Sequence, residues 1–220
     1  MIPIANYGLL GLVDLGFYVL LPLFYSSPIR IGGLGLSPPI IGTIRATFGF
    51  VDGCVQALFA AKMIRWFGAK NVFFWAVLWI YPLILFFPIM SAVVTMHGKV
   101  GPLIWFLLVA QLMCMVLMDL AFSACVWSKM DDRSHRRVAV IFVFVTRAAP
   151  NKESLGSVHG ISQSFASIAR AIGPVLTTSS FAASKQYNIL GGNFAYVVLA
   201  ILTTILVMLS LCLPDLKDDE

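Results

Sequence analysis

The sequence predicts an all-α fold, a polytopic membrane helix bundle with about six transmembrane helices, and three observations support this prediction. Sixty per cent of the 220 residues are hydrophobic, and the mean hydropathy is +0.92. Only 11% of the residues are charged, which is too few to cover the surface of a soluble domain. The apolar stretches are also long and continuous, whereas the strands of a membrane barrel would alternate over about 10 residues.

Six segments are long and apolar enough to cross a bilayer, which takes about 20 largely apolar residues. We predict spans at residues 2–23, 40–61, 72–94, 102–126, 155–181 and 193–213. Stretches rich in Gly and Pro, such as "SSPIRIGGLGLSPP", "MHGKVGP" and "NILGG", separate them and are typical of turns. We therefore treat residues 1–220 as a single transmembrane domain that ends in an acidic cytoplasmic tail, residues 214–220.

The basic residues are distributed unevenly between the two sets of loops. Ten lie in the loops after the second and fourth spans or in the tail, and three lie in the remaining loops. The ten are Lys62, Arg65, Lys70, Lys129, Arg133, Arg136, Arg137, Arg147, Lys152 and Lys217; the three are Arg30, Lys99 and Lys185. Because cytoplasmic loops carry an excess of Lys and Arg, this asymmetry predicts that both termini face the cytoplasm. The net charge of +5 is therefore interpreted as a topology signal rather than as a sign of nucleic-acid binding.

Ionisable side chains inside the predicted spans are the first candidates for a functional site, because charges at bilayer depth usually face a bundle interior or a wet cavity. Asp14 and Asp52 lie near the middle of the first and second spans. Arg45 lies close enough to the outer end of its span to snorkel to the interface. It is about 10 Å from Asp52 along the helix axis, so a third group or water is needed to link them. Asp119 lies near the cytoplasmic end of its span, where interfacial water can solvate it.

Arg170 is the deepest of these charges. It lies about 22 Å along the fifth span, counted from residue 155. An arginine keeps its proton in proteins, so this side chain is a fixed positive charge. The sequence leaves two interpretations open: a structural ion pair with Asp14 or Asp52, or a substrate-binding or coupling site.

The residues around Arg170 predict a helix in the bundle interior. Small residues recur at Gly156 and Gly160, which allows neighbouring helices to approach closely. Gln163 adds a polar side chain that a lipid-facing helix does not need. The pair Gly173 and Pro174 follows Arg170 and predicts a bend. We therefore expect this helix to form the wall of a cavity.

Signatures of enzymes and metal sites are lacking. The three histidines form no H-x-x-H or H-E-x-x-H pattern, and there is no G-x-S-x-G and no glycine loop suited to phosphate. The four cysteines form no C-x-x-C pair. We accordingly predict no enzyme activity, no cofactor, no metal and no nucleic-acid partner.

Several segments, taken together, resemble the C-terminal half of major facilitator superfamily transporters of a fungal type, similar to zinc-induced-facilitator-like members. "PLFYSSPIRIGGLGLSPPIIGTI" looks like the end of the seventh helix, the outer loop and the start of the eighth. "RWFGAK" occupies the place of the second cytoplasmic loop motif, although Arg65 stands where the family has an acid. "RAAPNKESLGSVHGISQSFASIARAIGP" looks like the eleventh helix and the loop before it, and it is the most specific match.

The resemblance also indicates an insertion. The charged stretch "SKMDDRSHRR" precedes "VAVIFVFV", which is too short to cross a bilayer. Its simplest interpretation is a cytoplasmic loop with a short interfacial piece. In the family the tenth helix runs almost directly into the following loop, so we predict that residues 126–141 are an inserted segment.

The resemblance implies a secondary active transporter that works by alternating access and is driven by protons. A full member has two six-helix halves with the substrate between them, and this chain corresponds to one. Its expected partners are membrane lipid, a small-molecule substrate, protons, and a separate N-terminal half or a second copy. Asp14 and Asp52 are the candidate proton carriers. The alternative is a truncated, non-transporting membrane protein. Plasma and vacuolar membranes are not distinguished, nor are the substrate and the direction of transport.

Overall fold

A computed structural model describes residues 2–67, 69–119 and 155–211. The helices are α1 (Ile2–Ser26), α2 (Pro38–Phe67), α3 (Ala69–Leu78), α4 (Ile80–His97), α5 (Pro102–Asp119), α7 (Leu155–Gln186) and α8 (Phe194–Leu211). Short 3-10 turns occur at η1 (Ile29–Ile31) and η3 (Ile189–Gly192). The predicted insertion at 126–141, the tail at 214–220 and the end of the fourth predicted span lie outside the described residues.

The predicted helical membrane bundle is confirmed, and its helices fall into two kinds. Among the described residues, four spans are long and apolar enough to cross a membrane: Ala5–Ser26, Phe74–His97, Pro102–Asp119 and Phe194–Leu211. The helices α2 and α7 are 30 and 32 residues long but lie outside this set. Both carry charged and small polar side chains along their length. The described part of the bundle therefore combines four apolar spans with two helices, α2 and α7, that are more polar than these spans.

The third predicted span consists of two helices in series. The helix is interrupted at Trp79, between α3 and α4, yet Phe74–His97 still forms one candidate span. Pro82 explains the interruption, because it has no N–H to donate to the carbonyl of Leu78 four residues earlier. Gly98 then ends α4 in a left-handed conformation, and its N–H donates to the carbonyl of Val94 at 2.8 Å.

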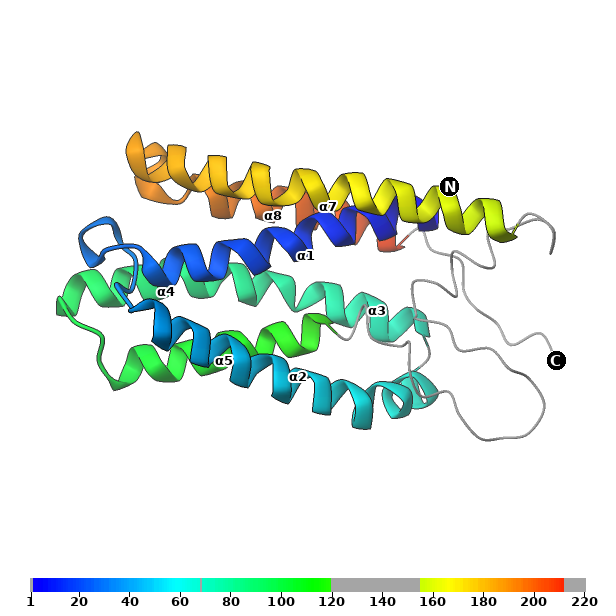
Figure 1. Cartoon of the computed structure of the whole chain (residues 1–220), viewed down its shortest axis with the longest axis horizontal. Helices are drawn as coiled ribbons and strands as arrows, with labels where there is room; N and C mark the ends of the chain where they lie inside the picture. The colour runs from blue at the N-terminus through cyan, green and yellow to red at the C-terminus, as the bar shows by residue number, and fades with distance from the viewer. Residues whose placement is uncertain (1, 68, 120–154, 212–220) are drawn as a thin grey trace.

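The connections gather at the two ends of the bundle as the sequence predicts (Figure 1). The α1–α2, α4–α5 and α7–α8 connections lie at one end, and the start of the chain and the α2–α3 connection both lie at the opposite end. Arg30, Lys99 and Lys185 accordingly share the first end, whereas Lys62 lies toward the second. That the second end faces the cytoplasm stays a prediction from charge.

The helix α1 lies inside the bundle and packs most extensively against α7. The contact is close because small residues line it. A Cβ added at Gly173 of α7 would lie 2.6 Å from the carbonyl oxygen of Leu12, and one added at Gly16 of α1 would lie 2.7 Å from Thr177 Oγ1. The α7 face toward this contact is small and buried; it comprises Ser162, Ala166, Ala169, Gly173 and Thr177. Backbones can approach so closely only where side chains are this small.

Aromatic rings fill the core between α1, α4 and α8. The ring of Phe87 stacks on Tyr196 with centroids 5.1 Å apart and meets Phe24 edge-on at 5.2 Å. Phe17 is 6.4 Å from the same ring. These geometries are the ones that aromatic pairs favour. The core therefore fixes α1 on its apolar side and leaves its opposite side to the polar helices.

Candidate functional site

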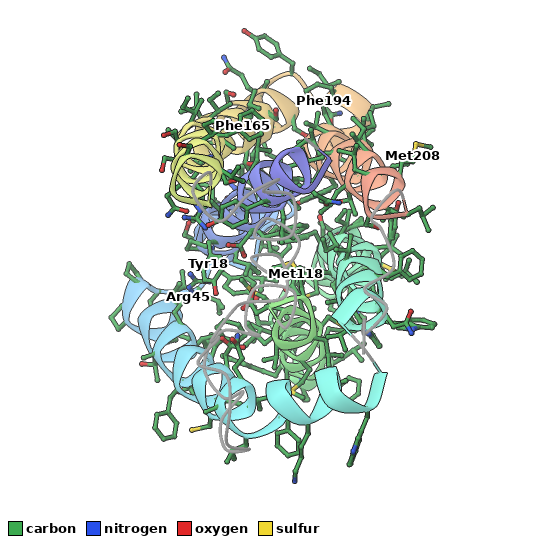
Figure 2. The ribbon with its side chains drawn as sticks, turned by 90° about the vertical axis from the view of Figure 1, so that its right-hand side faces the viewer. Tyr18, Arg45, Met118, Phe165, Phe194 and Met208 are labelled. Atoms are coloured by element: carbon green, nitrogen blue, oxygen red, sulfur yellow. The ribbon has the colours of Figure 1, made fainter. Side chains whose placement is uncertain are left out.

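The polar side of α1 carries three tyrosines and one carboxylate. Tyr7, Asp14, Tyr18 and Tyr25 are separated by seven, four and seven residues, which places them on one face of the helix. This face lies between α7 on one side and α2 and α5 on the other (Figure 2). Arg45 of α2 and the α7 residues Arg170 and Gln163 meet α1 here.

Arg170 contacts the first of these tyrosines. Its Nη2 donates a hydrogen bond to the hydroxyl of Tyr7 at 3.2 Å, and its guanidinium carbon lies 5.5 Å from the centre of the Tyr7 ring. The Tyr7 hydroxyl in turn donates to Oε1 of Gln163 at 3.1 Å. The structure therefore brings Arg170 and Gln163 together through a tyrosine that the sequence analysis did not single out.

Arg45 contacts the second tyrosine. Its guanidinium carbon lies 4.7 Å from the centre of the Tyr18 ring, within the range of a cation–π contact. Figure 2 shows both side chains between α1 and α2. The Tyr18 hydroxyl donates to Oδ2 of Asp119 at 3.1 Å, and Asp119 is only 4% exposed. Asp119 is thus buried within the bundle and joined to α1.

The carboxylate of Asp52 accepts a hydrogen bond from a residue of its own helix. Nε2 of Gln56, one turn further along α2, lies 2.9 Å from Oδ1 and 2.8 Å from Oδ2 of Asp52. Arg45 lies seven residues before Asp52 and therefore shares its helix face, but the Arg45 guanidinium is directed to Tyr18. Asp52 therefore has an amide partner and does not link to Arg45.

Asp14 lies between the two arginines and bonds to neither. Both Arg170 and Arg45 lie within electrostatic reach of its carboxyl group. Within the described residues, however, no ion pair joins Arg170 to Asp14 or Asp52. The buried Oδ1 of Asp14 has no hydrogen-bond partner in the same part of the chain. A buried carboxylate oxygen without a partner is costly, so Asp14 is the least satisfied acidic group of the site.

Two prolines add acceptors to the same region. Pro22 follows Tyr18 by four residues in α1, and Pro174 follows Arg170 by four residues in α7. Proline has no N–H, so neither carbonyl receives the helical hydrogen bond from its usual donor. The two carbonyls freed in this way are those of Tyr18 and Arg170, which are themselves members of the arginine–tyrosine contacts. Each can accept a hydrogen bond from a bound molecule or from water.

The predicted small residues of α7 have different surroundings. Gly173 faces α1 at the close contact described above, whereas a Cβ added at Gly156 or Gly160 would meet nothing within 4 Å. The described part of the chain thus supplies no surface for Gly156 and Gly160 to pack against. The bend predicted at Pro174 stays a prediction, and the helix continues through that residue.

Comparison with known proteins gives two fungal relatives. The chain is 26% identical over 184 residues to the major facilitator superfamily multidrug transporter mfsB of Aspergillus fumigatus. This match covers 79% of the chain. The chain is 24% identical over 189 residues to the major facilitator-type transporter psiT2 of Psilocybe cubensis, and this match covers 85% of the chain. This chain is a distant relative of the major facilitator superfamily transporters. No protein-family model matches it, and neither does a solved structure.

The matched region is a fraction of each relative. It covers 27% of the Aspergillus protein and 34% of the Psilocybe protein. The chain therefore spans about a third or less of the length of the major facilitator proteins that it matches.

The sequence analysis of this major facilitator relative missed the residues that organise the site. Tyr7 and Tyr18 hold the two arginines, and a second buried pair joins Tyr25 to Oε1 of Gln111 at 3.0 Å. The spacing of the three tyrosines relative to Asp14 was a readable signal, because it places all four on one helix face. The partners of the tyrosines could not be predicted from the sequence, because each partner lies on a different helix from the tyrosine that it contacts.

Proposed function

We propose that this chain is the C-terminal half of a secondary active transporter that moves a small molecule across a membrane by alternating access. The relationship to major facilitator transporters supports transport in general. The observation that carries the proposal is the polar face of α1, on which fixed cations and a buried carboxyl group with an unpaired oxygen meet at bilayer depth.

In this proposal the polar side of α1, α2, α5 and α7 is the wall of the substrate cavity. Six-helix halves of such transporters rock about a central site, so the second wall is supplied by an N-terminal half. Arg170 and Arg45 attract anionic groups of the substrate, and Gln163 orients it. Asp14 carries the coupling proton in an antiport cycle, with Asp52 as the second candidate. Both termini face the cytoplasm.

Transport in a host that lacks its own drug exporters tests the proposal. Ethidium is a suitable fluorescent probe, because one relative is named a multidrug transporter. The chain expressed alone is compared with the chain expressed together with the N-terminal half of a major facilitator transporter. We expect ethidium efflux only from the pair, and we expect a protonophore to abolish it. Arg170→Ala should remove the efflux, and Arg170→Lys should reduce it, because lysine lacks the planar guanidinium that stacks on tyrosine.

The second candidate function is a non-transporting membrane protein or a half-subunit. The exposed polar and small residues of α2 and α7 favour an associating subunit over an isolated bundle. The mass of the purified protein in detergent separates these possibilities. A stable monomer of 24.1 kDa that never binds an N-terminal half and exports no ethidium would contradict the transporter proposal.

A further inference from the structure

We propose that Tyr7 and Tyr18 hold the two arginines away from Asp14, so that Asp14 can bind a proton, and that Arg170 replaces this proton when it leaves. This inference rests on the proposed function and assigns the tyrosines as positioning residues within it. The tyrosines contact the arginines and not the proton-binding group, so they act through another residue.

The first support is the direction of the two guanidinium groups. Each arginine lies within electrostatic reach of Asp14, and a carboxylate is the strongest partner for a guanidinium. Arg170 nevertheless donates to the Tyr7 hydroxyl, and Arg45 lies over the Tyr18 ring. Asp14 is left with a buried oxygen that has no hydrogen-bond partner among the described residues. Binding a proton removes the cost of this arrangement, because a neutral carboxyl group tolerates burial.

The second support is the set of charges around Asp14. The helix α7 contributes Arg170, and α2 contributes Arg45 and Asp52. Asp119 of α5 lies within electrostatic reach as well. The fourth neighbouring helix, α8, carries no charged side chain. Loss of the proton from Asp14 therefore creates a negative charge, and the cations within electrostatic reach that can compensate this charge are Arg170 and Arg45.

The third support is a path for Arg170. Gly11 lies on α1 between Tyr7 and Asp14, and the arginine stem rests against it. A Cβ added at Gly11 would lie 3.3 Å from Nε and 3.4 Å from Cγ of Arg170. Asp14 is three residues from Gly11, or about 4.5 Å along the axis, which is within reach of a turned guanidinium group. After Asp14 gives its proton to water, Arg170 exchanges the Tyr7 hydroxyl for the carboxylate by rotating its side chain over this glycine.

Carbodiimide labelling tests the proposal on the whole chain without any substrate. Dicyclohexylcarbodiimide reacts with protonated carboxyl groups in apolar surroundings, and peptide mass spectrometry locates the product. We expect label on Asp14 in the unaltered protein in detergent. Tyr7→Phe should lose most of this label, because Arg170 loses its hydroxyl acceptor and pairs with Asp14 instead. The double variant Tyr7→Phe, Arg170→Ala should regain the label.

The controls separate this effect from misfolding and from transport. Tyr81→Phe removes a hydroxyl that bonds to Thr204 at 3.1 Å outside the site, so its label should equal that of the unaltered protein. Recovery of label in the double variant shows that loss in the single variant is not a folding defect. An unlabelled Asp14 in the unaltered protein, or full label in Tyr7→Phe, would overturn the proposal. Ethidium efflux that fails while this labelling pattern holds would refute transport alone.

Discussion

At the residue scale, tyrosines determine where the charged groups of the bundle are directed. Both half-buried arginines contact a tyrosine of α1, and one of these tyrosines also holds Asp119. A tyrosine suits this position because its ring attracts a cation while its hydroxyl both donates and accepts. A guanidinium group can therefore remain inside the bundle without an ion pair. The charges of this site are consequently held in place without being neutralised by one another.

The Tyr25 hydroxyl gives a test of hydrogen bonding within this face. Tyr25 donates to Gln111, and both side chains are buried. Tyr25→Phe removes the donor and leaves the ring, so we expect the free energy of unfolding to fall by about 1 kcal/mol. Unfolding in increasing sodium dodecyl sulfate, followed by circular dichroism, measures this change. Tyr187→Phe is the matched control, because Tyr187 is 70% exposed. An equal loss in both variants would show that the hydrogen bond is not the cause.

At the element scale, the two more polar helices of the bundle differ in how they meet α1. The helix α7 packs along α1 through glycine and other small residues, whereas α2 has a much smaller contact with α1, which includes Arg45. The α7 face that approaches α1 contains Gly173 and lies beside the predicted stripe that contains Gly156 and Gly160. The helix α7 thus carries two faces lined by small residues. One is buried against α1, and the other is exposed.

Two glycines of α7 test this distinction. A Cβ at Gly173 would lie 2.6 Å from a backbone oxygen of α1, so Gly173→Ala must push the two helices apart. We expect a loss of about 1–3 kcal/mol of unfolding free energy, as for other overpacked sites. Gly156→Ala has open space around it and should be neutral or stabilising by about 0.5–1 kcal/mol, since alanine favours helices. The same detergent unfolding measures both, and a neutral Gly173→Ala would contradict the close packing.

At the scale of the whole molecule, the side formed by α2 and α7 is called the polar side here, because it exposes glycines and serines in addition to large apolar side chains. The helices α4, α5 and α8 expose large apolar side chains such as Leu85, Phe106 and Ile201, which suits lipid. The helices α2 and α7 expose large apolar side chains too, such as Phe50 and Val175, but they also expose glycines, and α7 adds exposed serines. In lipid, small exposed residues favour contact with another helix. The polar side is therefore the side expected to face the cavity and an N-terminal half.

Two cysteines report on this division. Cys54 is exposed on α2, two residues after Asp52 in the sequence, and Cys114 is buried on α5. In membranes, a water-soluble maleimide should modify Cys54 and leave Cys114 unmodified, because only a thiol in contact with water ionises and reacts. The assay uses a background in which Cys125 and Cys212 are replaced by serine. The variant Lys99→Cys, in the exposed loop between α4 and α5, is the positive control for the maleimide. If this cysteine reacts and Cys54 does not, α2 lies against lipid or protein instead.

The sequence by itself determined the class of the molecule and its division into helices. Continuous apolar stretches and few charges leave a helical bundle as the stable solution in lipid, because a helix satisfies its own backbone. The same reading found Arg170, Arg45, Asp14 and Asp52, since charges are conspicuous in apolar surroundings. These inferences depend on composition and spacing along the chain, which are fully present in the sequence.

Only the tertiary structure decided which groups meet. Arg170 contacts Tyr7 rather than a carboxylate, Asp52 binds Gln56 of its own helix, and Asp14 retains an unpaired buried oxygen. Arg170 and Tyr7 are 163 residues apart in the chain, and they meet because Gly173 and Gly16 let α7 approach α1 closely. Side-chain pairing of this kind depends on the distance and rotation between helices. Those quantities are set by the packing of many side chains at once, so no local pattern in the sequence records them.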